Sequence, residues 1–158
     1  MVAATATPEP SQTLAPAARK LWRLEGGVGT LVALVPAILV QLLAGGIWAL
    51  LAWVALAVFA LFATVLVPEV RWRRWRWEVR EHEIDLRHGT WEVIRTLVPM
   101  ARVQHVTTRR DPFQQALDLA TVVVHTAAGA NEIPALTVAE AARVRDRIAE
   151  LARTPDEL

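Results

Sequence analysis

The sequence contains no cysteine, and its single lysine is Lys20, so arginine carries nearly all of the positive charge. The absence of cysteine excludes disulfides, thiolate metal ligands and a thiol nucleophile, and it fits a domain that faces a reducing cytoplasm. The formal net charge at pH 7 is only +1. Because a balance so close to zero gives no electrostatic reason for nucleic acid to bind, we expect no nucleic-acid partner.

Patterns that mark catalytic and metal sites are missing as well. The chain has no Gly-x-Ser-x-Gly motif and no phosphate-binding glycine loop, and Asp111 and Glu132 are isolated in expected loops. Its histidines are His82, His88, His105 and His125. They lack the i, i+4 spacing of a helical metal site, and no carboxylates accompany them as a ligand set. We therefore predict a protein that is not an enzyme and holds no metal and no cofactor.

Ionisable side chains are absent from Gly26 to Val67, a run twice as long as the roughly 20 residues that one membrane-spanning helix needs. We therefore predict two spans, at about 27–44 and 47–67. The paired glycines Gly45 and Gly46 permit the sharp turn between them. Pro68 predicts the end of the second helix, because it has no backbone N–H to donate. The alternative, a buried hairpin of a soluble protein, would need a larger core than 158 residues supply.

Basic residues flank both predicted spans on the same side. Those before the first span are Arg19, Lys20 and Arg23, and those after the second are Arg71, Arg73, Arg74 and Arg76. The turn between the spans has no basic residue. Since positive charge is retained on the cytoplasmic side, we predict a multi-pass protein of the plasma membrane with both termini in the cytoplasm.

The sequence divides into four predicted parts. Residues 1–18 are rich in Ala, Thr and Pro without helical or strand periodicity, which predicts a disordered N-terminal tail. A signal peptide is the alternative, but it would need basic residues nearer the start. The transmembrane helical hairpin follows at 19–68, then a cytoplasmic domain at 69–153 and a short C-terminal tail at 154–158.

The predicted cytoplasmic domain has the alternating pattern of strands. Trp75, Trp77 and Val79 alternate with charged residues, and Ile84 and Leu86 alternate with Asp85 and Arg87. We expect a turn at 88–89, further strands near 91–98, 102–109, 120–126 and 132–135, and a short helical turn within 113–119.

The final element has the clearest helical signature. Thr137 and Glu140 form a capping box, and a single helix face carries Ala141, Val144, Ile148 and Leu151. The predicted fold class is α+β, with a terminal helix that lies over an apolar surface of the sheet.

Four short sequence motifs recur in the same order in one protein family. They lie at 102–106 (RVQHV), 111–115 (DPFQQ), 119–122 (LATV) and 133–136 (IPAL). Over about residues 18–153 the chain resembles the bacterial pleckstrin-homology-like membrane proteins of the YdbS-like type. The resemblance implies a strongly bent, PH-like antiparallel sheet, capped by the C-terminal helix and held beneath a transmembrane hairpin. It implies no particular chemistry, because folds of this kind serve as lipid, peptide or protein docking modules.

Two sets of residues are candidate binding sites. The first is a lipid-facing or anchoring cluster of arginine, lysine and tryptophan: Arg19, Lys20, Trp22, Arg23, Arg71, Trp72, Arg73, Arg74, Trp75 and Arg76. These residues either only set topology and anchor the helix ends, or recognise a specific head group. The second set is a possible partner loop formed by Arg109, Arg110 and Phe113, for which an ordinary solvated turn with Phe113 in the core is the alternative.

Our leading functional hypothesis is a non-enzymatic, membrane-anchored docking or assembly protein. Binding of an anionic lipid or small ligand at the inner membrane surface is the second hypothesis, and an accessory subunit of a transporter is the third. Besides the lipid bilayer, we expect a homo-oligomer or a related membrane protein as partner. An exposed sheet edge and the small residues Gly26, Gly27, Gly29, Ala33 and Ala37 favour such association. Gln41 is expected to make an interhelical hydrogen bond.

Overall fold

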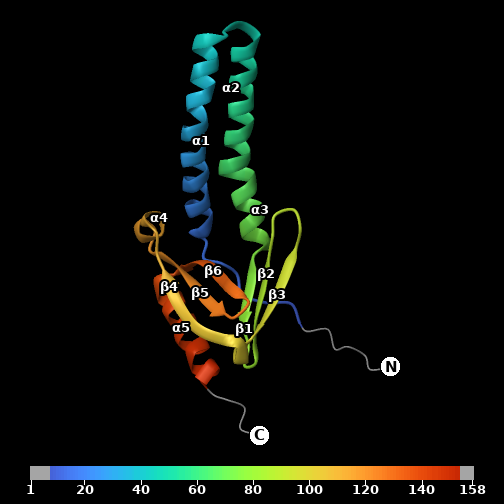
Figure 1. Ribbon diagram of the computed structural model, residues 1–158, viewed down its shortest axis with the longest axis vertical. Helices are drawn as coiled ribbons and strands as arrows, with labels where there is room; N and C mark the ends of the chain where they lie inside the picture. Colours follow the sequence, from blue (N-terminus) through green and yellow to red (C-terminus); the bar gives the residue numbers. More distant parts are fainter. Residues whose placement is uncertain (1–7, 154–158) are drawn as a thin grey trace, which may run out of the picture.

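The computed structural model describes residues 8–153, in which two long antiparallel helices stand on a β-rich domain (Figure 1). Helix α1 spans Ala18–Leu43. The second helix consists of α2 at Gly46–Leu61, a π-helical segment η1 at Phe62–Leu66, and α3 at Val67–Arg74. Gly45, between the helices, and Gly46, the first residue of α2, have φ angles of 61° and 52°. The predicted glycine turn is therefore confirmed, because this backbone conformation favours glycine.

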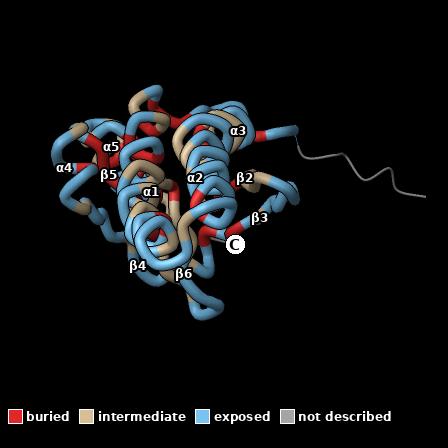
Figure 2. Tube along the Cα trace, turned by 90° about the horizontal axis from the view of Figure 1, so that it is seen from above, coloured by how far each residue is buried: buried red, intermediate tan, exposed pale blue. Residues whose placement is uncertain are grey.

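Both long helices have the length and composition to cross a membrane. Ala18–Leu43 contains a window of mean hydropathy 2.0, and Gly46–Arg74 one of mean hydropathy 2.7. These helices of 26 and 29 residues are about 39 Å and 44 Å long at about 1.5 Å per residue, which exceeds a hydrocarbon core of about 30 Å. Seen along the hairpin, α1 and α2 are mostly exposed or intermediate, and most buried segments lie in the elements around them (Figure 2).

The second helix does not end at Pro68, which corrects our prediction. It continues as α3 to Arg74, and the N–H of Val67, just before the proline, donates to Phe62 O, five residues back. A regular helix would bring the proline ring against the carbonyl one turn earlier, and the wider π turn relieves that clash. The basic residues Arg71, Arg73 and Arg74 are therefore helical.

Two three-stranded antiparallel sheets form the domain. The first has the order β1-β2-β3, with β1 at Arg76–Val79, β2 at Glu83–His88 and β3 at Ile94–Pro99. The second has the order β4-β5-β6, with β4 at Val103–Arg109, β5 at Leu119–Thr126 and β6 at Gly129–Thr137. A 3-10 turn, η2 at Met100–Arg102, joins the sheets, and a short helix, α4 at Pro112–Ala116, joins β4 to β5. The predicted α+β fold class is confirmed.

Helix α5 at Val138–Arg153 covers the second sheet, as predicted. The backbone N–H of Glu140 donates to the Thr137 hydroxyl at 3.2 Å, which confirms the Thr137 half of the predicted capping box. The Glu140 carboxylate makes no return hydrogen bond within residues 8–153. Ala141, Val144 and Ile148 are buried against the core, with Leu151 packed at its margin. The helix therefore uses the apolar face that its sequence periodicity indicates.

Residues 8–17, which we call the N-terminal strap, depart from the predicted disordered tail. Gln12 pairs with Trp77 of β1 through two backbone hydrogen bonds of 3.1 and 3.0 Å, and Leu14 is only 1% exposed. Apolar side chains here are few, but backbone pairing and burial of Leu14 order the segment. The rest of the predicted tails, 1–7 and 154–158, lies outside the described residues.

The strap lies along the β1 edge of the first sheet and pairs with it through one antiparallel bridge. Strap and β1 are antiparallel neighbours, and the chain between them is the whole helical hairpin. The core of the β-rich domain also includes Leu14, Ala18, Leu21 and Trp22. The domain is thus built from both sides of the hairpin, rather than from residues after 69 alone.

Candidate functional site

Two cation–π pairs join the lower ends of the long helices. The Arg19 guanidinium carbon of α1 lies 4.4 Å from the Trp72 ring centroid of α3. In the opposite direction, the Arg71 guanidinium carbon of α3 lies 4.3 Å from the Trp22 ring centroid of α1. Each helix thus supplies one cation and one ring. Such pairs are stronger when they are shielded from water, so they hold the two helix ends together at the base of the hairpin.

Further polar contacts fix this junction to the strap. The indole N–H of Trp72 donates to the carbonyls of Leu14 and Ala15 at 3.3 and 3.2 Å. The Glu69 carboxylate pairs with Arg73 at 2.8 Å on its own helix and with Arg19 at 3.5 Å on α1. These contacts hold the strap against the lower ends of the two long helices.

This arrangement corrects part of the predicted lipid-facing cluster. Trp22 and Trp75 are buried at 5% and 7% exposure, so their rings pack inside the protein rather than against lipid. The exposed members of the cluster are Lys20, Arg23, Arg73 and Arg74. A tryptophan at a helix end can either contact lipid at the membrane interface or pack inside the protein. The sequence does not distinguish these two roles, because they depend on which residues surround the ring in the folded structure.

Trp75 packs edge-on against His88 of β2, with ring centroids 4.6 Å apart. Neither Trp75 Nε1 nor His88 Nδ1 has a hydrogen-bond partner within residues 8–153. Burial lowers the pKa of His88, and the nearby charge of Arg71 lowers it further. His88 is therefore a neutral packing residue at neutral pH.

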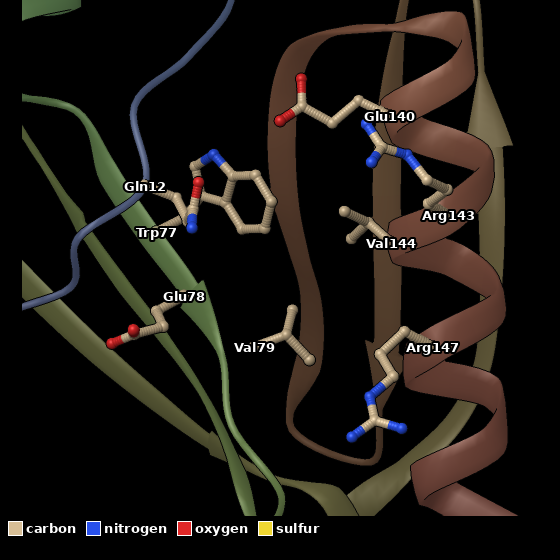
Figure 3. A pocket seen from close by; sticks show the side chains of 8 residues that line it. All are labelled: Gln12, Trp77, Glu78, Val79, Glu140, Arg143, Val144 and Arg147. Atoms are coloured by element: carbon tan, nitrogen blue, oxygen red, sulfur yellow. The ribbon is translucent and has the colours of Figure 1, made fainter.

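A groove of about 350 Å³ separates the first sheet from helix α5 (Figure 3). Its sheet side carries Gln12 of the strap and Trp77, Glu78 and Val79 of β1. Its helix side carries Glu140, Arg143, Val144 and Arg147, which follow one face of α5. Figure 3 shows the side chains of Val79 and Val144 directed toward each other across the groove, with the polar side chains around them. The floor is apolar and the walls are charged.

Two charged side chains in this groove are unpaired. Neither the Arg143 guanidinium nor the Glu140 carboxylate makes a hydrogen bond or ion pair with another described residue. Arg147, in contrast, pairs with Glu150 at 3.1 Å, one turn along the helix. The groove therefore offers an available cation and an available anion about one turn apart on α5, above an apolar floor. From the sequence we placed Glu140 only in the capping box and did not predict Arg143.

The predicted partner loop is largely engaged within the domain. Arg110 Nε donates to Leu119 O at 2.9 Å, and its Nη2 pairs with Asp118 at 3.3 Å. Arg109 pairs with Glu132 at 3.3 Å. Phe113 is 39% exposed, so its ring is not enclosed by the core as our alternative supposed. The two arginines hold the α4 connection against β5 and β6, and Phe113 remains the accessible part of this loop.

The histidines are distributed without a metal site among the described residues. No three His, Cys, Asp or Glu side chains within residues 8–153 come together in a way that could hold an ion. His105 and His125 stack across β4 and β5 with centroids 4.2 Å apart, and His125 Nε2 lies 3.3 Å from the Thr107 hydroxyl. These two rings form a cross-strand pair on the sheet surface.

Comparison with known proteins agrees with this architecture. Residues 26–152 match the family model described as Bacterial PH domain. The chain is 38% identical over 162 residues to the UPF0699 transmembrane protein YdbS of Bacillus subtilis strain 168, which covers 94% of this chain and 97% of the relative. No solved structure matches the chain. A family match over most of the chain, together with two exposed apolar helices and a capped β-rich domain, establishes that this membrane protein belongs to the bacterial PH domain family.

Proposed function

We propose that this chain is a non-enzymatic, membrane-anchored docking or assembly protein, with its PH-like domain and both termini on the cytoplasmic side. The orientation rests on the basic residues at the domain end of the hairpin, such as Arg23 and Arg73, and on the uncharged turn at Gly45 and Gly46. The plasma membrane is the corresponding location in a bacterium.

The observation that carries the docking function is the groove between β1 and α5. The charges of Glu140 and Arg143 on its wall are available to a ligand, and the apolar floor formed by Trp77, Val79 and Val144 favours a ligand that excludes water. A protein segment with an apolar side chain for the floor and a carboxylate for Arg143 satisfies both features. We therefore assign the groove to a segment of a partner membrane protein, either a second copy or a related chain.

Crosslinking in native membranes tests this function. A photoreactive residue replaces Arg143, inside the groove, or Arg145, which is exposed on another face of the same helix. After irradiation and detergent extraction, position 143 should give a defined protein adduct and position 145 should not. An accompanying Arg143→Glu substitution should reduce copurification of the same partner, because it repels the partner's carboxylate, whereas Arg145→Glu should have little effect.

Recovery of the chain alone from both positions would contradict the docking function. Retained anionic phospholipid in that sample would instead favour the second candidate, lipid recognition, for which the exposed Lys20, Arg23, Arg73 and Arg74 provide the charge. A transport protein as the recovered partner would identify the accessory-subunit role.

A further inference from the structure

The hairpin between β2 and β3 rises beside α3 toward the long helices (Figure 1). The loop at its tip, residues 89–93, requires a glycine at Gly89, where φ is 129° and an added Cβ would lie 1.7 Å from Glu92 O. The Arg74 guanidinium of α3 donates to Thr90 O at 2.5 Å. This hydrogen bond ties the tip of the hairpin to the helix.

Trp91 at this tip is 89% exposed, the most exposed large apolar side chain among the described residues. Val93 and Ile94, which follow it, are 49% and 47% exposed. Tryptophan normally covers much of its ring with protein, because its apolar area is large. An indole left open on a fixed hairpin, next to a membrane helix, needs an apolar environment from outside the chain.

A cleft of about 230 Å³ lies between this tip and the second helix. Phe62, Leu66, Val67 and Val70 line its helix side, Thr90 and Trp91 line its hairpin side, and Arg74 lies at its lower end. The walls are therefore almost wholly apolar, with one guanidinium at one end. This gradient matches the change from acyl chain to head group in a phospholipid.

The position of the cleft along the helix supports the same ligand. The residues from Phe62 to Arg74 cover about 18 Å of helix at about 1.5 Å per residue. Pro68 is the last residue of the uncharged run, and Glu69 is the first charged residue after it. The cleft thus extends from the hydrocarbon region into the interface, where a water-soluble partner cannot reach its upper part but lipid chains are always present.

We propose that this cleft is a lipid site, and that the β2–β3 hairpin is a third membrane contact beside the two spans. A phospholipid of the leaflet on the domain side places an acyl chain against Phe62, Leu66 and Val70. The Trp91 ring lies at the interface, and the lipid phosphate lies near Arg74. This site is separate from the β1–α5 groove and does not depend on the docking function.

Spin labelling tests the position of the hairpin, and the natural absence of cysteine allows single labels in the full-length chain. Trp91→Cys, Leu51→Cys in the middle of the second span and Arg153→Cys at the end of α5 are each labelled. The proteins are placed in vesicles of phosphatidylethanolamine and phosphatidylglycerol. Oxygen relaxes labels that lie in lipid, whereas a water-soluble nickel complex relaxes labels that lie in water. We expect oxygen to be the stronger relaxing agent for the label at position 91, as for the label at position 51. Relaxation dominated by nickel at position 91, as expected at 153, would overturn the proposal.

A second measurement addresses the bound lipid itself. Val70→Trp places a large ring in the cleft, whereas Val65→Trp places the same ring on the exposed surface of the helix outside it. Native mass spectrometry of the extracted protein should show loss of one retained phospholipid with Val70→Trp and no loss with Val65→Trp. Equal retention by both variants, or a dimer that Val70→Trp abolishes, would refute a lipid site here.

Discussion

At the scale of single residues, Asp85 is the strongest departure from the pattern of the sequence. Its place in an alternating strand predicts a side chain toward solvent, yet it is fully buried. Arg95 binds it through two hydrogen bonds of 3.0 and 2.6 Å, and Arg80 lies 3.3 Å away. Both arginines also donate to Pro8 O of the strap. The hydrogen bonds with Asp85 raise the pKa of Arg95, so this residue keeps its charge.

Replacement of this carboxylate should destabilise the fold. Asp85→Ala leaves two guanidiniums without their buried acceptor, and both lie partly in reach of water, so we expect a loss of about 2–3 kcal/mol in the free energy of unfolding. Chemical denaturation of the detergent-solubilised protein measures it. Asp146→Ala removes an exposed carboxylate paired with Arg145 and should cost less than about 0.5 kcal/mol. Similar losses in the two variants would contradict the structural role of Asp85.

At the scale of elements, the two long helices pack through small residues rather than leaving these free for a partner. A Cβ at Gly26 would lie 2.2 Å from the carbonyl oxygen of Ala63 in η1, and Ala37 is only 5% exposed. Gln41 accepts a hydrogen bond from Trp53 Nε1 at 3.2 Å, which confirms the predicted interhelical bond. Gly27, in contrast, has open space beside it. Small residues of α1 such as Gly26 and Ala37 therefore pack against the second helix within this chain. Association with another chain stays a prediction.

The close approach at Gly26 can be tested with its neighbour as control. Gly26→Ala forces the methyl group onto the backbone of η1, so the helices must separate and thermal stability in nanodiscs should fall by the equivalent of about 1–3 kcal/mol. Gly27→Ala adds the same methyl group on the open side. It should be neutral or stabilise by up to about 1 kcal/mol, because alanine favours the helix. Equal melting temperatures for the two variants would show that the approach at Gly26 is not tight.

At the scale of the whole molecule, the membrane hairpin is inserted between two neighbouring segments of one sheet. The strap and β1 meet at Gln12 and Trp77, and the chain between them forms the whole helical hairpin. Domain and hairpin therefore cannot rotate independently as they would on a single linker. A fragment that starts near Arg71 would lack Leu14, Leu21 and Trp22 of the core, so the domain is best studied in the full-length chain.

Loss of the strap anchor should therefore loosen the first sheet. Leu14→Ala opens a cavity beneath the hairpin, and large-to-small changes of this kind cost about 2–5 kcal/mol. Hydrogen–deuterium exchange should show reduced amide protection in β1 and β2, while α5 keeps more of its protection. Thr13→Ala, at an exposed neighbouring position, should leave exchange unchanged. If Leu14→Ala left β1 fully protected, the strap would not be part of the folded domain.

Much of this architecture follows from local properties of the chain. The long uncharged run specifies two long apolar helices, and Gly45 and Gly46 specify their turn. Alternation and the Thr137 cap specify the strands and α5. Each of these features depends on neighbours in sequence. The burial of Asp85 and Trp75, the strap and the charged groove beside α5 depend on residues distant in sequence. Only packing in three dimensions brings Pro8 to Arg95, Arg71 to Trp22 and Trp77 to Arg143, so tertiary structure alone decided which side chains hold the fold together and which remain available to bind.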